Sequence, residues 1–140
     1  MRKVYVKMIV MTILVAAAVP SWAQFDVNWA QALQTSIYFY DANMCGPDAG
    51  EASALQWRGP CHIQDAEAPH PSGTGTIDVR GGFHDCGDHV KFGQPQVYSI
   101  STLGWGYYEF KEGFIQSGQQ QHILDVLKWA CDYLLRCTVL

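Results

Sequence analysis

Two aspartates three residues apart are the positions in this sequence best suited to do chemistry. Asp85 and Asp88 lie in the segment 84–89, His-Asp-Cys-Gly-Asp-His, with apolar residues on both sides. The glycine between them, Gly87, predicts a tight turn on which the two side chains converge. Two like charges this close raise each other's pKa and can hold a water molecule between them. The pair therefore has the chemistry of a general base.

The same segment admits two other interpretations. Aspartates also form and cap turns, which is a common role for this residue type. His84 and His89 offer ring nitrogens that, with the carboxylates, resemble a set of metal ligands. Neighbouring residues on one turn cannot all face a single ion, so we expect no metal at this turn.

The first 23 residues have the pattern of a secretory signal peptide. A basic start (Arg2, Lys3, Lys7) is followed by an apolar run over 8–19 and a small residue, Ala23, at the expected cleavage point. The apolar run is shorter than the roughly 20 residues that span a bilayer. We expect a secreted protein with no membrane segment after cleavage.

The charge balance of the remaining residues limits the partners. Removal of residues 1–23 takes away three of the nine basic side chains and none of the 13 acidic ones. An acidic surface disfavours nucleic acid, because affinity for phosphates comes from Lys and Arg. An uncharged substrate suits such a protein better, and the length allows one modest core.

The five cysteines are an odd number for an exported chain, in which disulfides are expected. Cys45 and Cys61 lie in a loop-rich segment and are the better candidates for one bridge, whereas Cys131 and Cys137 are predicted to pack as small apolar residues in a helix. No C-x-x-C pair supports a zinc knuckle. We therefore predict neither a metal site nor a cofactor.

The elements that must position the aspartates are a first helix and a long loop. The helix is predicted from Trp29 to about Asp41, with Asp26 or Asn28 as its cap. Residues 42–95 hold nine of the 13 glycines and five of the six prolines, with no sustained period. Because loops this long in a compact domain are usually functional, we expect an ordered loop that lines the site.

Two further helices are predicted after the loop. The second, over residues 95–113, is apolar almost all round and should be buried on several sides. The third, over residues 119–138, has Asp132 and Arg136 at the spacing of a helical ion pair. Its predicted core stripe comprises Ile123, Val126, Leu127, Ala130, Cys131 and Leu134.

The expected fold class is therefore all-α, with about three helices and a long cleft-lining loop. Helices this apolar need more partner surface than the chain supplies. The last residues, 137–140, carry no cap, glycine or polar tail. We expect residues 24–140 to be the first part of a larger domain.

Four segments, in the same order and with similar gaps, resemble glycoside hydrolase family 9, whose members are mostly endoglucanases acting on cellulose. The most specific of them is Asp85 to Gly93, where the family usually has D-A-G-D-H-V-K-F-G; Cys86 stands here in place of the alanine. The others are residues 32–42, 57–59 and 123–137.

The resemblance implies the N-terminal portion of an (α/α)6 barrel and inverting hydrolysis of β-1,4-glucosidic bonds in a β-glucan. On the matching positions, Asp88 would be the general base and Asp85 would help to hold the attacking water. Trp57 and His84 are candidate sugar contacts. The family's general acid is a glutamate further on, so we expect the 140-residue chain alone to be inactive.

Two alternatives from other classes remain open. One is a secreted carbohydrate-binding module without catalysis, which would use the loop aromatics. The other is a secreted interaction domain stapled by disulfides. Binding to cellulose without hydrolysis would favour the first, and a low count of free thiols would favour the second.

Overall fold

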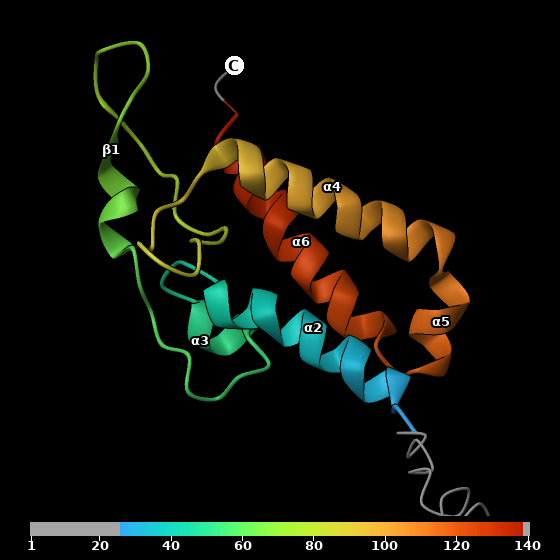
Figure 1. Ribbon diagram of the computed structural model, residues 1–140. Coiled ribbons are helices and arrows are strands. Elements are labelled where there is room, and N and C mark those ends of the chain that lie inside the picture. Colours follow the sequence, from blue (N-terminus) through green and yellow to red (C-terminus); the bar gives the residue numbers. More distant parts are fainter. Residues whose placement is uncertain (1–25, 139–140) are drawn as a thin grey trace, which may run out of the picture.

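Three long helices dominate residues 26–138, the part of the chain that the computed structural model describes (Figure 1). They are α2 (Trp29–Asn43), α4 (Gly93–Glu109) and α6 (Gln120–Arg136). Helix α6 packs against both α2 and α4, and the short helix α5 (Lys111–Gln116) lies between α4 and α6 in the chain. The predicted all-α class with about three helices is confirmed.

The predicted signal peptide, residues 1–23, lies outside the described residues. None of the helices within residues 26–138 combines the length and apolar character that a bilayer crossing requires.

Helix α2 is capped at its start by Asn28, one of the two predicted caps. The Asn28 side-chain oxygen accepts a hydrogen bond from the Gln31 N–H at 3.0 Å, which satisfies one of the free donors of the first turn. The helix ends at Asn43, slightly beyond the predicted end at Asp41. Both residues are buried, so α2 carries its polar end into the interior.

Helix α4 begins at Gly93, and Pro95 lies in its first turn, where a missing N–H costs nothing. The prediction of one helix up to Gly113 is wrong, because the backbone leaves the helical region at Phe110 (φ −116°, ψ 29°) before α5 starts. Within the described residues this helix keeps an exposed apolar face, which agrees with the expectation that the helices need more partner surface than the chain supplies. Trp105 and Tyr108 are 67% and 75% exposed.

Helix α6 buries the stripe that its periodicity predicts, with two corrections. Ile123, Val126 and Ala130 are buried, but Cys131 is exposed and Tyr133 takes the buried position near the end of the helix. Asp132 pairs with Lys128 at 2.5 Å and not with Arg136. Arg136 instead donates to the Arg80 carbonyl at 3.2 Å.

Residues 44–92 form the ordered loop that the composition predicts, with short elements that it does not predict. The two-residue strands pair antiparallel, with Ala68 opposite Ile77. The short elements of the loop are the helices α3 (Ala49–Ala52) and η1 (Ile63–Glu67) and the strands β1 (Ala68–Pro69) and β2 (Thr76–Ile77).

The far end of the loop returns to the end of α2. The Cys45 N–H donates to the Gly82 carbonyl at 2.8 Å, and the His84 N–H donates to the Asn43 carbonyl at 3.0 Å. These bonds seat the segment before Asp85 beside the helices. The core beneath it is formed by Ile37, Met44, Ala49, Phe83, Ile100, Phe114, Ile123, Val126 and Ala130.

Candidate active site

The segment 85–90 folds into a tight turn whose two carboxylates share one donor. The Asp85 N–H donates to the Val90 carbonyl at 3.0 Å, which closes the turn. The Val90 N–H donates to Asp88 Oδ1 at 3.0 Å and to Asp85 Oδ1 at 3.3 Å. Because both carboxylates accept from one amide, their oxygens converge. The structure thus brings together the two aspartates that the sequence paired.

The unusual backbone angle of this turn belongs to His89 and not to Gly87. His89 has φ of 60°, in the left-handed region that few residues other than glycine adopt, whereas the φ of Gly87 is not positive. A Cβ at Gly87 would meet only Asp85 Oδ2, at 3.9 Å. The tight turn predicted at Gly87 is present, but neither its backbone angle nor its surroundings require a glycine at this position.

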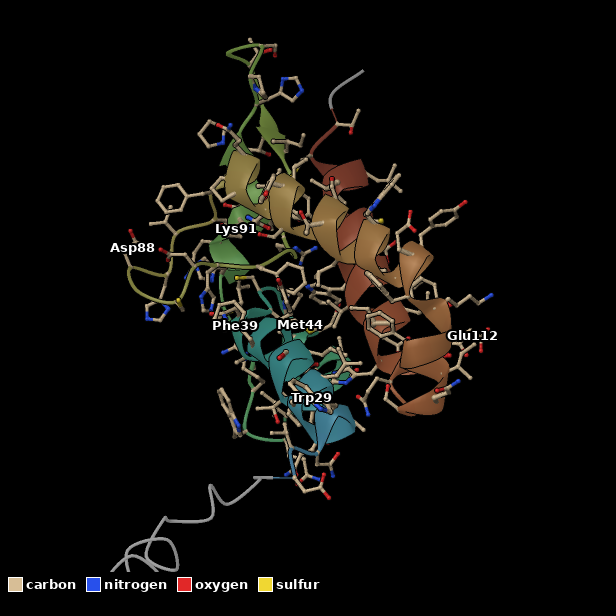
Figure 2. All side chains as sticks on the ribbon, turned by 45° about the vertical axis from the view of Figure 1, so that its right-hand side comes forward. Trp29, Phe39, Met44, Asp88, Lys91 and Glu112 are labelled. Carbon is tan, nitrogen blue, oxygen red and sulfur yellow. The ribbon has the colours of Figure 1, made fainter. Side chains whose placement is uncertain are left out.

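The two carboxylates are exposed to solvent, and Figure 2 shows Asp88 on the outer edge of its loop. Hydrogen bonding to the Asp88 side chain, aided by backbone N–H groups, holds the pKa of Asp85 below its ordinary value. The expectation that the pair would raise each other's pKa is therefore wrong for Asp85. Its exposed carboxylate can accept hydrogen bonds from water.

The residues just before the turn are fixed to α4 and α6. The Phe83 N–H donates to Gln96 Oε1 at 3.0 Å, and Trp129 Nε1 donates to the Gly82 carbonyl at 2.9 Å. Gly82 has φ of +72°, and a Cβ there would lie 2.6 Å from a Tyr133 ring carbon. A glycine is required at 82 because α6 approaches the backbone so closely.

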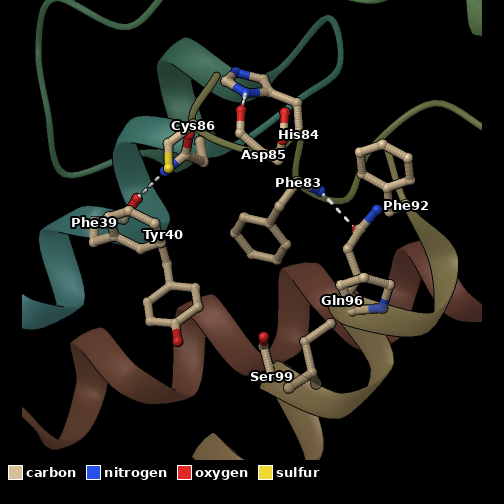
Figure 3. A pocket seen from close by; sticks show the side chains of 12 residues that line it. Phe39, Tyr40, Phe83, His84, Asp85, Cys86, Phe92, Gln96 and Ser99 are labelled. Carbon is tan, nitrogen blue, oxygen red and sulfur yellow. Dashed lines mark hydrogen bonds between the residues drawn. The ribbon is translucent and has the colours of Figure 1, made fainter. Parts of the chain in front are cut away.

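A cavity of about 180 Å³ lies between α2, α4 and the turn (Figure 3). His84, Asp85 and Cys86 contribute the turn's side of this cavity, and its other walls are largely apolar. Its remaining lining residues are Phe39, Tyr40, Asn43, Phe83, Phe92, Pro95, Gln96, Ser99 and Ile100. Of the two predicted sugar contacts, His84 thus lies beside Asp85.

Two cysteines and two histidines gather behind the turn. The ligand atoms of Cys45, Cys61 and His84 lie within 4.8 Å of one another. The rings of His62 and His84 stack with centroids 5.6 Å apart. Both cysteines are free thiols, so the predicted Cys45–Cys61 disulfide is wrong, although the two residues are neighbours as predicted.

The two thiols of this cluster differ in pKa because their surroundings differ. Burial raises the pKa of Cys45 to about 12. Burial also acts to raise the pKa of Cys61, but hydrogen bonds with His62, the Gly46 N–H and Arg58 outweigh it and lower that pKa. Burial lowers the pKa of His84 and favours its neutral ring. Cys61 is thus the more readily ionised thiol.

The comparison with known families decides the identity of the fold and the turn. Residues 29–140 match the profile of Glycosyl hydrolase family 9. The chain belongs to this family.

Named relatives within family 9 include bacterial and plant proteins. Endoglucanase 4 of Bacillus sp. (strain KSM-522) is 39% identical over 112 residues, which are 79% of this chain and 16% of that protein. Endoglucanase 23 of Oryza sativa subsp. japonica is 35% identical over 78% of this chain and 20% of its own length. The chain therefore spans a small part of the relatives it matches.

Solved family 9 structures share the fold. The catalytic domain of Clostridium thermocellum CelT matches with a TM-score of 0.73 and 48% identity, over 80% of this chain and 27% of that chain. The cellulase Cel9M of C. cellulolyticum in complex with cellobiose matches with a TM-score of 0.67 and 48% sequence identity. The match covers 79% of this chain and 24% of that chain. The three helices and their loop thus correspond to the N-terminal part of an (α/α)6 barrel.

The other predicted sugar contact of this family 9 chain, Trp57, lies apart from the cavity beside Asp85. Its side chain is 69% exposed and is not among the residues that line that cavity. Arg58 beside it forms no ion pair with a carboxylate in the described chain. Its guanidinium donates to the Met44 carbonyl and to Cys61 Sγ, the latter at 3.2 Å.

The cluster behind the turn is the part of the site that sequence reasoning missed. Two thiols and two imidazoles are the donors that a tetrahedral zinc ion prefers. The His62 ring, whose Nδ1 atom is buried, stacks beside His84 at the edge of this group. Cys45, Cys61, His62 and His84 could therefore hold Zn²⁺. The adjacent pair Cys61-His62, downstream of Cys45, was the available signal.

Proposed function

We propose that this chain is part of a secreted enzyme that hydrolyses β-1,4-glucosidic bonds in cellulose or a related β-glucan, with inversion at the anomeric carbon. The observation that carries the proposal is the convergence of Asp85 and Asp88 on the Val90 amide, on an exposed turn. The family supports the reaction class, since its members named above are endoglucanases.

In this proposal Asp88 acts as the general base. An inverting hydrolase needs a carboxylate that takes a proton from a water while an acid on the other side of the bond protonates the leaving oxygen. Asp88 lies on the outer edge of its loop, where a water can reach it (Figure 2). Asp85, kept ionised by its hydrogen bonds, would hold the same water from a second side.

The substrate class rests on relatives whose structures contain sugars. Solved relatives are in complex with cellobiose, cellotriose or cellotetraose. We infer that a β-1,4-linked glucan occupies the corresponding surface here, beside the turn and the cavity of His84. Trp57 remains a candidate contact at a more distant position of such a chain, because its ring is free to stack.

The division of the sequence follows from the same proposal. Residues 1–23 would be a signal peptide and residues 24–140 the first part of the catalytic domain. The acid partner would come from sequence that these residues do not contain. We therefore expect no turnover of carboxymethyl-cellulose by the 140-residue chain alone.

The decisive experiment compares variants of a protein that carries a complete family 9 domain, including the residues of this chain. Asp88→Asn should lower kcat on cellotetraose by roughly 10²–10⁴-fold, the usual contribution of general acid–base catalysis. Asp125→Asn, which changes an exposed aspartate on α6, is the matched control and should leave kcat unchanged. NMR of the first product should show the inverted anomer.

Full activity of Asp88→Asn would refute the assignment of the base. Cellulose binding without any hydrolysis, retained in Asp88→Ala, would instead support a carbohydrate-binding module. The disulfide-stapled alternative is disfavoured, because all five cysteines are free in the structure.

A further inference from the structure

The residue that follows the turn, Lys91, has its charged end inside the molecule. Its side chain is 9% exposed, in contrast to the 74% of Lys128 on α6. Figure 2 shows Asp88 on the outer edge of the loop and Lys91 behind it, against the body of the chain. A buried ammonium group is costly unless its donors are satisfied.

All three donors of this ammonium group have acceptors on other segments of the chain. Lys91 Nζ forms an ion pair with Asp65 of η1 and donates to the carbonyls of Val79 at 2.7 Å and Gly81 at 3.3 Å. It also lies 4.9 Å from the centre of the Tyr133 ring on α6. The loop and α6 therefore fix the ammonium group from several sides.

Asp65 depends on the same contact. Its Oδ2 atom is buried and has no hydrogen-bond donor other than the Lys91 ammonium group. Removal of Lys91 would leave the buried Asp65 Oδ2 atom without a partner, and removal of Asp65 would leave the ammonium group with two neutral carbonyl acceptors only. The Asp65–Lys91 pair thus holds η1 and the residue after the turn together.

Lys91 directly follows Val90, the residue whose N–H aligns the two carboxylates. Val90, the residue before Lys91, donates its N–H to Asp85 and Asp88 and accepts the Asp85 N–H on its carbonyl. The turn itself is exposed, and the peptide group that carries the Val90 N–H is also held at its other end, where His62 Nε2 lies 2.9 Å from the His89 carbonyl oxygen. The direction of the Val90 N–H therefore depends on two anchors: the His62 ring on the preceding carbonyl and the buried Lys91 side chain on the following residue.

We propose that Lys91 is a positioning residue for the general base: its buried ammonium group, held by Asp65 and the carbonyls of Val79 and Gly81, sets the Val90 amide on which Asp85 and Asp88 converge. Lys91 touches neither carboxylate and acts through the backbone. The catalytic meaning of this inference rests on the proposed function, but the geometric effect is measured without turnover.

The test is amide hydrogen exchange by NMR in the 140-residue chain. In Lys91→Met, exchange of the Asp85 and Val90 amides should accelerate by at least about tenfold, because local opening sets their protection. The Ala130 amide in the middle of α6 should change far less. Lys91→Arg keeps the charge and the donors and should restore most of the protection and the Val90 amide chemical shift.

Lys128→Met is the matched control, since it removes an exposed lysine and an exposed ion pair by the same substitution. It should leave the Asp85 and Val90 amides unchanged. Equal loss of protection at Val90 and Ala130 in Lys91→Met would show a purely structural role and would overturn the inference. Unchanged protection at Val90 would overturn it as well.

If Lys91→Met does not fold, Asp65→Asn provides the same test with the two carbonyl acceptors retained. A smaller loss of protection confined to residues 85–90 supports the inference, and no local loss refutes it. Activity of a complete family 9 product that does not depend on Asp88 would refute the proposed function, while the exchange data on Lys91 would stand.

Discussion

Asp41 and His122, 81 positions apart in sequence, meet in a hydrogen-bonded contact between the end of α2 and the start of α6. His122 Nε2 lies 2.6 Å from Asp41 Oδ2, and the Asp41 side chain is 1% exposed. Asp41 Oδ1 also accepts the Ala54 N–H at 2.8 Å. One carboxylate thus joins two helices and the start of the loop that carries the candidate site.

Replacement of Asp41 by alanine should therefore destabilise the fold strongly. The variant leaves the His122 ring and the Ala54 N–H without their partner, and loss of one member of a buried pair costs about 3–5 kcal/mol. Urea unfolding followed by circular dichroism would measure the free energy of unfolding. Asp125→Ala, at an exposed position on α6, is the control and should change it by less than about 0.5 kcal/mol.

Gly82→Ala should also destabilise the chain, through backbone strain and through a clash with Tyr133. Gly73→Ala, which has the strain without the clash, separates the two effects. At Gly82 the new Cβ would lie 2.6 Å from the Tyr133 ring and φ is +72°, whereas at Gly73 φ is +81° and no atom lies within 4 Å. Gly73→Ala pays only the left-handed backbone cost of roughly 1–2 kcal/mol. Gly82→Ala should lose about 1–3 kcal/mol more, from overpacking. Equal losses in thermal unfolding would contradict this.

The long helices could be predicted because their causes are local. The stripe of Ile123, Val126 and Ala130 follows the helical period, and Asn28 is a preferred cap type. The break between α4 and α5 was missed because Phe110 is no helix breaker in itself, and the packing across the break involves side chains on both helices. Tyr107 of α4 packs its ring against Phe114 of α5, with centroids 5.6 Å apart.

The candidate site was predictable only in part, for the same physical reason. The spacing of Asp85 and Asp88 restricts both to one turn, so their proximity follows from the sequence. The grouping of Cys45 and Cys61 with His84 requires the antiparallel bridges of Gly46 with Cys61 and of Met44 with Phe83. Such long-range pairing leaves no periodic signal, and the cysteines alone suggested a disulfide.

The cluster of Cys45, Cys61, His62 and His84 should bind one Zn²⁺ per chain. Cys45, Cys61 and His84 place three donors of the preferred kind within 4.8 Å of one another, and the His62 ring stacks beside His84. Metal analysis after dialysis should give one zinc per chain, and Co²⁺ in its place should show thiolate charge-transfer absorption. Cys61→Ser should abolish both signals. Cys131→Ser, at an exposed cysteine of α6, should leave them intact, and zinc retained in Cys61→Ser would exclude this site.

Stability in acid should depend on Asp78. Hydrogen bonds from the Arg80 side chain and N–H hold the pKa of Asp78 well below its ordinary value. Because the unfolded value is about 3.9, the ionised form favours folding above that pH. This contribution is lost as the pH falls through the lower, folded-state pKa. Asp78→Asn should make unfolding less dependent on pH below about 4, whereas Asp125→Asn should not; identical acid profiles would argue against the pair.

The aromatic face of α4 should make the 140-residue chain bind apolar dyes in its folded state. Trp105 and Tyr108 are 67% and 75% exposed, and their rings lie 5.9 Å apart. Exposed apolar patches of this kind mark surfaces that associate with a partner. The double variant Trp105→Ser/Tyr108→Ser should lower the fluorescence of bound anilinonaphthalene sulfonate and reduce self-association in sedimentation velocity. Trp57→Ser removes an equally exposed loop tryptophan, 69% exposed, and should change neither. If both variants lower the signal equally, dye binding reports exposed rings in general and not a surface of α4.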